Sequence, residues 1–150
     1  MFERILIATD GSKHSERAAE AGIEMAKLYG SAVTALFVVD IGKEYAPLGD
    51  LISKVADDLI ASIRGNLQKQ GDEATKSVVD MAEKAGIAVT RKITEGYPAE
   101  DIIRTAEEGD MNLIVMGGIG ATGLERFLLG SVADKVVRSS KIPVLVVRKE

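Results

Sequence analysis

Five short apolar segments alternate along the chain with stretches in which apolar residues recur at helical spacing. The segments are RILIAT (Arg4–Thr9), AVTALFVV (Ala32–Val39), IAVTRKI (Ile87–Ile93), NLIVM (Asn112–Met116) and VLVV (Val144–Val147). Four of them are nearly continuous runs of Val, Ile, Leu and Ala, which is typical of strands buried on both faces of a parallel sheet. The third segment alternates apolar and polar residues, so we expect it at an edge of the sheet.

Helices are expected between these strands. The first begins after Ser12, a favourable N-cap residue, and ends at Gly30. The second is long, because steps of three and four between apolar residues persist over Asp50–Ala85. Gly65 and Gly71 lie within this stretch as weak points, and we expect one helix to continue across both.

Two shorter helices follow. Pro98 suits the first position of a helix, and the acidic residues Glu100 and Asp101 are favourably placed in its first turn. The last helix is expected to begin near Ser131, where Asp134 follows three residues later in a pattern like a capping box.

The order β-α-β-α-β-α-β-α-β predicts an α/β fold: an open, doubly wound, five-stranded parallel sheet of the Rossmann-like type, with helices on both faces. The least regular stretch is Ile41–Gly49, and no linker or repeat marks a second domain, so we expect residues 1–150 to form one domain. In such sheets, ligands bind at the carboxyl ends of the strands, where the strand order reverses.

Glycines gather after the fourth expected strand. Five of the 15 glycines of the chain lie in one short stretch, at Gly117, Gly118, Gly120, Gly123 and Gly130. Glycines directly after a strand allow a ligand to approach the backbone closely, and their amides can hold an anion. Gly130 and Ser131 open a helix whose first amides favour phosphate. The plainer interpretation is a tight, flexible surface loop.

The cluster differs from two well-known phosphate loops. A Walker A loop requires a Lys before the Ser, and no Lys precedes Ser131. The run Gly118-x-Gly120-x-x-Gly123 fits the dinucleotide-binding pattern, but it follows the fourth strand rather than the first. We treat that match as accidental.

An acidic residue follows each of the first two strands. Asp10 could accept hydrogen bonds from a ribose hydroxyl or an adenine amino group, or could simply be the turn residue of an Asp-Gly pair. For Asp40 we favour the turn role. The single histidine, His14, is expected to be exposed in the first helical turn.

The composition excludes several classes of protein. The net charge is −4 and the isoelectric point about 5.2, whereas domains that bind nucleic acid usually have values above about 9. With no Cys and one His, the chain lacks thiolate and paired-histidine metal ligands. No apolar run is long enough to span a membrane. We therefore expect a cytoplasmic protein that binds neither nucleic acid nor membranes, and that ligates no metal by itself.

The sequence resembles the universal stress protein family, in its ATP-binding branch, over nearly the whole chain. Four segments carry the resemblance, in the order of the family: ILIATDGS (Ile5–Ser12), EGYPAEDI (Glu95–Ile102), the glycine-rich stretch Met116–Ser131, and IPVLVVR (Ile142–Arg148). The most specific of these is the glycine-rich stretch. Two residues separate Gly117 from Gly120, nine separate Gly120 from Gly130, and Ser131 follows directly.

This resemblance implies a five-stranded sheet in the order 3-2-1-4-5. It also implies ATP as ligand, or ADP or AMP in its place, with Mg²⁺ accompanying the nucleotide. The nucleotide contacts of the family correspond here to Ala8, Thr9, Asp10, Val38, Met116, Gly117, Gly120, Gly130, Ser131 and Val132. Asp10 would lie near the adenosine and Val38 on the adenine side. Gly130, Ser131 and Val132 would serve the phosphates.

The family further implies a homodimer formed by antiparallel pairing of the last strands, here Val144, Leu145, Val146 and Val147. Without such pairing, this strand would be an apolar, exposed sheet edge. The chain departs from the family in charge, because many members carry Arg, His or Lys where it has Ile119 and Ala121. Arg126 and Lys13 are candidates to replace that charge.

The leading functional hypothesis is an ATP-binding regulator of the stress response that acts as a nucleotide-dependent switch on an unknown protein partner. A slow ATPase or phosphotransferase is an alternative, although the loop offers little cationic help for phosphoryl transfer. A nucleotide-free dimeric interaction module is another. A phospho-receiver domain is rejected, because the third strand ends in Ile93-Thr94-Glu95 without the required phosphoacceptor Asp.

Overall fold

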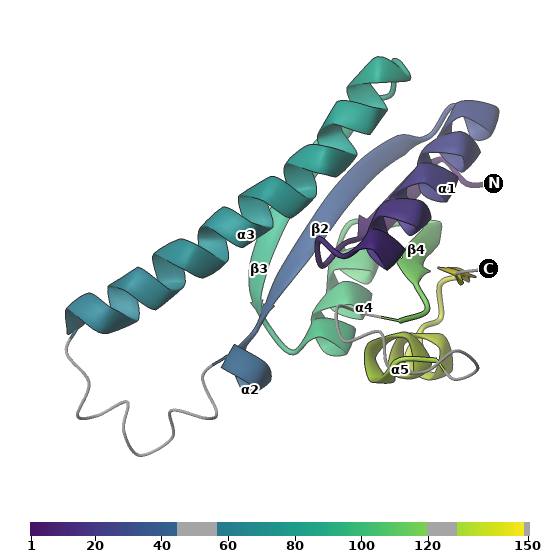
Figure 1. Ribbon diagram of the computed structural model, residues 1–150. Coiled ribbons are helices and arrows are strands. Elements are labelled where there is room, and N and C mark those ends of the chain that lie inside the picture. Colours follow the sequence, from purple (N-terminus) through teal and green to yellow (C-terminus); the bar gives the residue numbers. More distant parts are fainter. Residues whose placement is uncertain (45–56, 120–128, 149–150) are drawn as a thin grey trace.

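The computed structural model describes residues 1–44, 57–119 and 129–148. Five parallel strands form one sheet in the order β3-β2-β1-β4-β5, which confirms the expected topology (Figure 1). The strands are β1 (Arg4–Ala8), β2 (Ala32–Asp40), β3 (Val89–Gly96), β4 (Leu113–Gly117) and β5 (Val144–Val147). The helices are α1 (Lys13–Tyr29), α2 (Ile41–Glu44), α3 (Asp57–Lys84), α4 (Pro98–Glu108) and α5 (Ser131–Ser139).

Helices cover both faces of the sheet, as alternation along β1 illustrates. Ile5 and Ile7 pack with residues of α1 and α3, whereas Leu6 and Ala8 pack with residues of α4 and α5. Because successive side chains of a strand point to opposite faces, the apolar run Ile5–Ala8 of β1 requires helices on both sides. Leu6 and its neighbours Ile5 and Ile7 are completely buried. No helix among the described residues is long and apolar enough to cross a membrane.

The helix ends follow the sequence signals. The Ser12 side chain accepts a hydrogen bond from the Ser15 amide at 3.2 Å and caps α1, while Gly30 ends the helix in the left-handed conformation at φ 63°. Pro98 is the first residue of α4. The long helix α3 is continuous across Gly65 and Gly71, as expected, and the part of the prediction before Asp57 lies outside the described residues.

Gly71 allows close packing of α3 on the sheet and does not interrupt the helix. A Cβ at this position would lie 2.9 Å from Cδ1 of Phe37 and 3.0 Å from Cδ1 of Ile93. Real Cβ contacts are longer, so the glycine lets α3 lie directly on β2 and β3. Gly65 has no atom within 4 Å of the same position, so its only effect is on helix propensity.

The structure corrects several local expectations. The third strand begins at Val89, because the Ile87 amide still donates to the Ala82 carbonyl at the end of α3, and it continues to Gly96. The short helix α2 was not predicted. Asp40 stabilises it by accepting from the Lys43 amide at 3.1 Å, which is the turn role favoured for Asp40.

The capping box of the last helix also does not form. Gly130, not Ser131, is the N-cap residue, and no side chain of the described residues caps α5. Asp134 instead receives a hydrogen bond from Arg138, one turn further along, at 3.0 Å. The first turn of α5 therefore keeps its backbone amides directed toward the carboxyl edge of the sheet.

Candidate functional site

The strand order reverses between β1 and β4, so the carboxyl ends of these two strands define the candidate site. β1 pairs with β2 on one side and with β4 on the other. Thr9 and Asp10 follow β1 directly, and Gly117 and Gly118 stand at the end of β4. In doubly wound sheets, this is the place where connections diverge to opposite faces and leave room for a ligand.

The turn after β1 is fixed by its own polar groups. The Thr9 amide donates to the Leu36 carbonyl at 2.9 Å, and its Oγ1 lies 3.1 Å from the Ser15 hydroxyl and accepts from the Gly11 amide at 3.1 Å. Thr9 is buried, whereas Asp10 is exposed. This network fixes the direction in which the chain leaves the strand.

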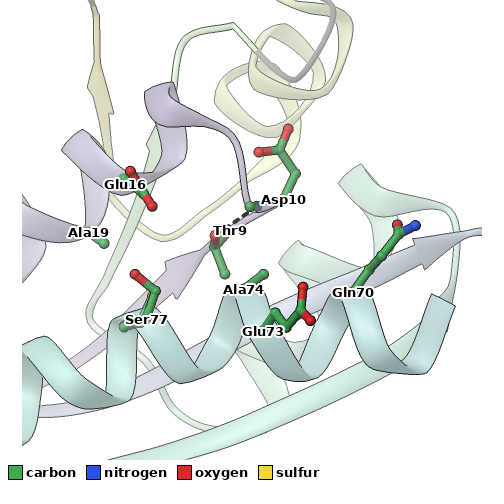
Figure 2. A pocket seen from close by; sticks show the side chains of 10 residues that line it. Thr9, Asp10, Glu16, Ala19, Gln70, Glu73, Ala74 and Ser77 are labelled. Carbon is green, nitrogen blue, oxygen red and sulfur yellow. Dashed lines mark hydrogen bonds between the residues drawn. The ribbon is translucent and has the colours of Figure 1, made fainter. Parts of the chain in front are cut away.

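Asp10 has the turn role, which was one of the two roles expected for it from the sequence. Its Oδ1 accepts from the Ser12 amide at 2.9 Å, just before α1 begins. A carboxylate has about four lone-pair sites, so this bond is compatible with a second role toward a ligand. Figure 2 shows the Asp10 side chain extending away from α3, while Thr9 lies over Ala74.

Gly117 lies against the first turn of α1. A Cβ on Gly117 would lie 3.2 Å from the carbonyl carbon and oxygen of His14 and 3.4 Å from its Cβ. His14 is half-buried, so the expectation of an exposed histidine was wrong. The reason is tertiary: the amino end of α1 packs on the end of β4.

Gly118 ties the two ends of the glycine-rich loop together. Its amide donates to the Val147 carbonyl of β5 at 3.0 Å, and its carbonyl accepts from the Gly130 amide at 2.6 Å. A Cβ here would lie 3.1 Å from Cγ of Arg148 and 3.2 Å from Cγ1 of Val146. Gly118 is therefore a close-packing position rather than a merely flexible one.

The Gly118 bond changes the role expected of Gly130. The Gly130 amide is already hydrogen-bonded and places the N-cap of α5 beside the end of β4. The first bond inside α5 runs from the Asp134 amide to the Gly130 carbonyl at 2.9 Å. The amides of Ser131 and Val132 find no acceptor among the described residues, so they are the donors that α5 presents at this edge.

Three apolar site candidates lie on the same face of the sheet as α5. Ala8 and Met116 are buried in the cluster beneath α4 and α5, and Val38 is half-buried against it. The structure thus brings Ala8, Val38 and Met116 together with Val132 of α5 on one face. Gly120 and Arg126 lie outside the described residues, as does Ala121.

A cavity that shares Thr9 and Asp10 with this site opens on the other face, between α1 and α3. It has a volume of about 390 Å³, and its lining includes Thr9, Asp10, Glu16, Gln70, Glu73 and Ser77 (Figure 2). Three of the lining residues are acidic and none is basic, which disfavours phosphate. Sequence reasoning missed this cavity. The sequence signal for it was a row of polar residues on one face of α3. Gln70, Glu73 and Ser77 follow one another at steps of three and four residues, and Ala74 beside them is buried.

Ionisable groups at the site are few. Among residues 1–44, 57–119 and 129–148, no three His, Asp or Glu side chains gather in a geometry that could hold a metal ion. On the α5 face, Lys135 forms an ion pair with Glu100 and so links α5 to α4. The hydrogen bond from the Lys135 ammonium lowers the pKa of Glu100 below its ordinary value.

The five-stranded, doubly wound parallel sheet defines a Rossmann-like α/β protein. Its strand order reverses between β1 and β4, where the candidate site lies. The chain belongs to the Universal stress protein family, whose model matches residues 1–148. It is 42% identical over 149 residues to universal stress protein MJ0531 of Methanocaldococcus jannaschii, covering 99% of this chain and 84% of that protein.

Solved structures agree with this membership. The structure of MJ0577, also from M. jannaschii, has a TM-score of 0.82 at 29% identity, with 100% of this chain and 98% of that chain covered. A universal stress protein of Archaeoglobus fulgidus in complex with dAMP has a TM-score of 0.66 at 25% identity, covering 98% and 99%. A universal stress protein in complex with cAMP has the same TM-score and identity, covering 98% and 97%.

Proposed function

We propose that this protein binds ATP, or ADP or AMP in its place, at the carboxyl edge between β1 and β4, and acts as a nucleotide-dependent regulator in the stress response. The observation that carries the proposal is the Gly130 to Gly118 hydrogen bond, which sets the uncapped first turn of α5 beside Gly117. Helix amides and the helix dipole at such a position favour phosphate. Relatives in complex with dAMP and cAMP support a nucleotide as the ligand.

The proposed contacts divide by chemistry. The apolar residues Ala8, Val38 and Met116 would face the adenine, and Thr9 and Asp10 the nucleoside, where Asp10 can accept from a ribose hydroxyl or the adenine amino group. Gly117, Gly120 and Gly130 would let the backbone approach closely. The Ser131 and Val132 amides would donate to phosphate, and Mg²⁺ would arrive with the nucleotide.

Regulation would follow from the connection between β4 and α5. The two ends of the connection are held together by the Gly118 to Gly130 hydrogen bond. A nucleotide held there would change the surface that Gly117, Gly118 and the first turn of α5 present to a protein partner. We propose that residues 1–150 work as one such unit, in the cytoplasm. The absence of cysteine is consistent with this location, because the chain depends on no disulfides.

We also propose a homodimer through β5. The Pro143 carbonyl accepts from the Ile114 amide of β4, and the Val147 carbonyl accepts from the Gly118 amide just after β4. The backbone groups of Val144 and Val146 therefore point toward the open side of the sheet. All four β5 residues are only half-buried, and Val137 of the neighbouring α5 is 45% exposed. A second β5 would cover this apolar edge.

Calorimetric titration of ATP into the purified protein tests nucleotide binding, after any nucleotide that copurifies has been identified by mass spectrometry. The proposal expects saturable binding, which Gly130→Val weakens by crowding the approach to α5. No heat of binding at millimolar ATP, together with no copurified nucleotide, would refute it.

A further inference from the structure

The carboxylate of Asp101 lies directly over Gly96, where the chain turns from β3 into α4. A Cβ built on Gly96 would lie 2.6 Å from both carboxylate oxygens of Asp101, so only a glycine leaves room for this side chain. Asp101 is buried, with 3% of its surface exposed. Its Oδ1 accepts from Nη2 of the largely exposed Arg104 at 2.7 Å. Its Oδ2 is shielded from solvent and has no hydrogen-bond partner among the described residues.

The hydroxyl of Thr94 is a second shielded group that lacks a partner in the described part of the chain. Thr94 lies two residues before Gly96 on β3, and side chains two residues apart on a strand share a face. Thr94 therefore points to the side of the sheet on which α4 packs over β2 and β3. A hydroxyl and a carboxylate oxygen, both without partners, thus stand on one face beneath the amino end of α4.

Both groups lie beside the proposed place of the base. Thr94 is paired in register with Val38 of β2, which is half-buried in the cluster beneath α4 and α5 and is proposed above to face the adenine. Two residues earlier on β2, Leu36 pairs with Ala8 of β1. Thr94 and Asp101 therefore lie on the side of Val38 away from β1, where a base that extends from the edge between β1 and β4 would end.

The missing partners define the chemistry of the base. A buried donor or acceptor without a partner costs free energy, which a ligand that supplies the partner recovers. A carboxylate oxygen accepts a hydrogen bond and a threonine hydroxyl can donate one. Adenine offers the complementary pair, an exocyclic amino group beside a ring nitrogen that accepts. Side chains commonly change rotamer on binding, and such a change at Thr94 or Asp101 would bring these shielded atoms to the base.

We propose that Thr94 and Asp101 read the base of the nucleotide and select adenine over purines that carry a carbonyl in place of the amino group. Asp101 accepts from the amino group, and Thr94 donates to the ring nitrogen. A carbonyl oxygen at the same place would instead face the carboxylate and be repelled. The inference rests on the proposed function, because it assumes that a nucleotide binds at the edge between β1 and β4. It adds two specificity-determining residues, from β3 and α4, outside the glycine-rich loop.

The test compares the dissociation constants of ATP and inosine triphosphate, which carries a carbonyl in place of the amino group, by calorimetry. Asp101→Asn replaces a carboxylate oxygen by an amide donor of the same shape, and Thr94→Val removes the hydroxyl. Asp80→Asn and Thr90→Val are the matched controls, because Asp80 is an exposed, ion-paired aspartate of α3 and Thr90 an exposed threonine of β3. Thermal unfolding verifies that each variant folds.

The wild type is expected to bind ATP about tenfold more tightly than inosine triphosphate, the scale of one hydrogen bond to a charged group. Asp101→Asn should remove this preference by weakening ATP binding alone, and Thr94→Val should weaken ATP binding by a smaller factor. Both control variants should bind like the wild type. A merely structural role for Asp101 would not change the ratio of the two dissociation constants.

A wild type that binds both nucleotides equally, or an unchanged ratio in Asp101→Asn, would overturn the inference while leaving the proposed function intact. Unchanged ATP affinity in Thr94→Val would overturn it as well, which keeps the inference testable if Asp101→Asn fails to fold. A wild type that binds neither nucleotide would refute both the inference and the proposed function.

Discussion

The amide of Gly130 donates to the carbonyl of Gly118 at 2.6 Å, so the chain leaves β4 and enters α5 at nearly the same point. This bond closes the glycine-rich connection at its base and aims the first turn of α5 at the end of β4. The geometry of the candidate site depends on it more than on any single side chain.

Gly118→Val should destabilise the protein by about 1–3 kcal/mol, the usual cost of overpacking. The added atoms would collide with the side chains of Val146 and Arg148, and Leu129 is also near, at 3.6 Å from the Cβ position. Urea unfolding measures the loss, and Gly118→Ala should show a smaller one. If Gly118→Val unfolds like the wild type, the close packing described at this position is incorrect.

The two glycines inside α3 should respond in opposite ways to alanine. Gly65→Ala should stabilise the protein by about 0.5–1 kcal/mol, because its surroundings are open and Ala is the better helix former. Gly71→Ala should destabilise the protein despite the better helix propensity of Ala, because the added Cβ would clash with Phe37 and Ile93. The pair is compared by thermal and urea unfolding, and a stabilising Gly71→Ala would contradict the close approach of α3 to the sheet.

Ser12→Ala should cost about 1 kcal/mol, because the Ser15 amide loses its capping acceptor at the start of α1. Ser62→Ala, at an exposed position within α3, is the matched control and should change stability little. Both are measured as free energies of unfolding in urea. An equal effect of the two substitutions would remove the capping role assigned to Ser12.

Val144→Pro should convert the proposed dimer into a monomer. Proline removes an amide that faces the open side of β5, and such a position on an edge strand tolerates proline within the subunit. Sedimentation velocity on the wild type and the variant decides the matter, with circular dichroism as the control for folding. A wild type that sediments as a monomer at tens of micromolar, or a variant that stays dimeric, would exclude pairing through β5.

The fold was largely predictable from the sequence, because its signals are local. Continuous apolar runs identified the buried strands, and Ser12, Gly30 and Pro98 marked helix ends through their own backbone chemistry. The site was less predictable, since its decisive contacts join distant segments. Nothing local indicates that Gly117 meets His14 or that Gly118 meets Arg148, because these contacts arise only when α1 and β5 pack beside β4.

The cap of α5 illustrates the same limit. Ser131 and Asp134 have the spacing of a capping box. However, the hydrogen bond between Gly118 and Gly130 makes Gly130 the N-cap residue, and the first turn of α5 has no side-chain cap among the described residues. Likewise, β3 begins two residues later than its apolar pattern suggests, because the end of α3 holds Ile87. A hydrogen bond between two segments decided the first boundary, and the local hydrogen bond that ends α3 decided the second.

The most direct test of the central claim is a titration of ATP into isotope-labelled protein, followed through backbone amide resonances. The claim predicts saturable shifts at Gly117, Gly118, Ser131 and Val132, with Gln70, Glu73 and Ser77 of the acidic cavity unchanged. Shifts confined to the cavity residues, or no shifts at millimolar ATP, would contradict nucleotide binding at the edge between β1 and β4.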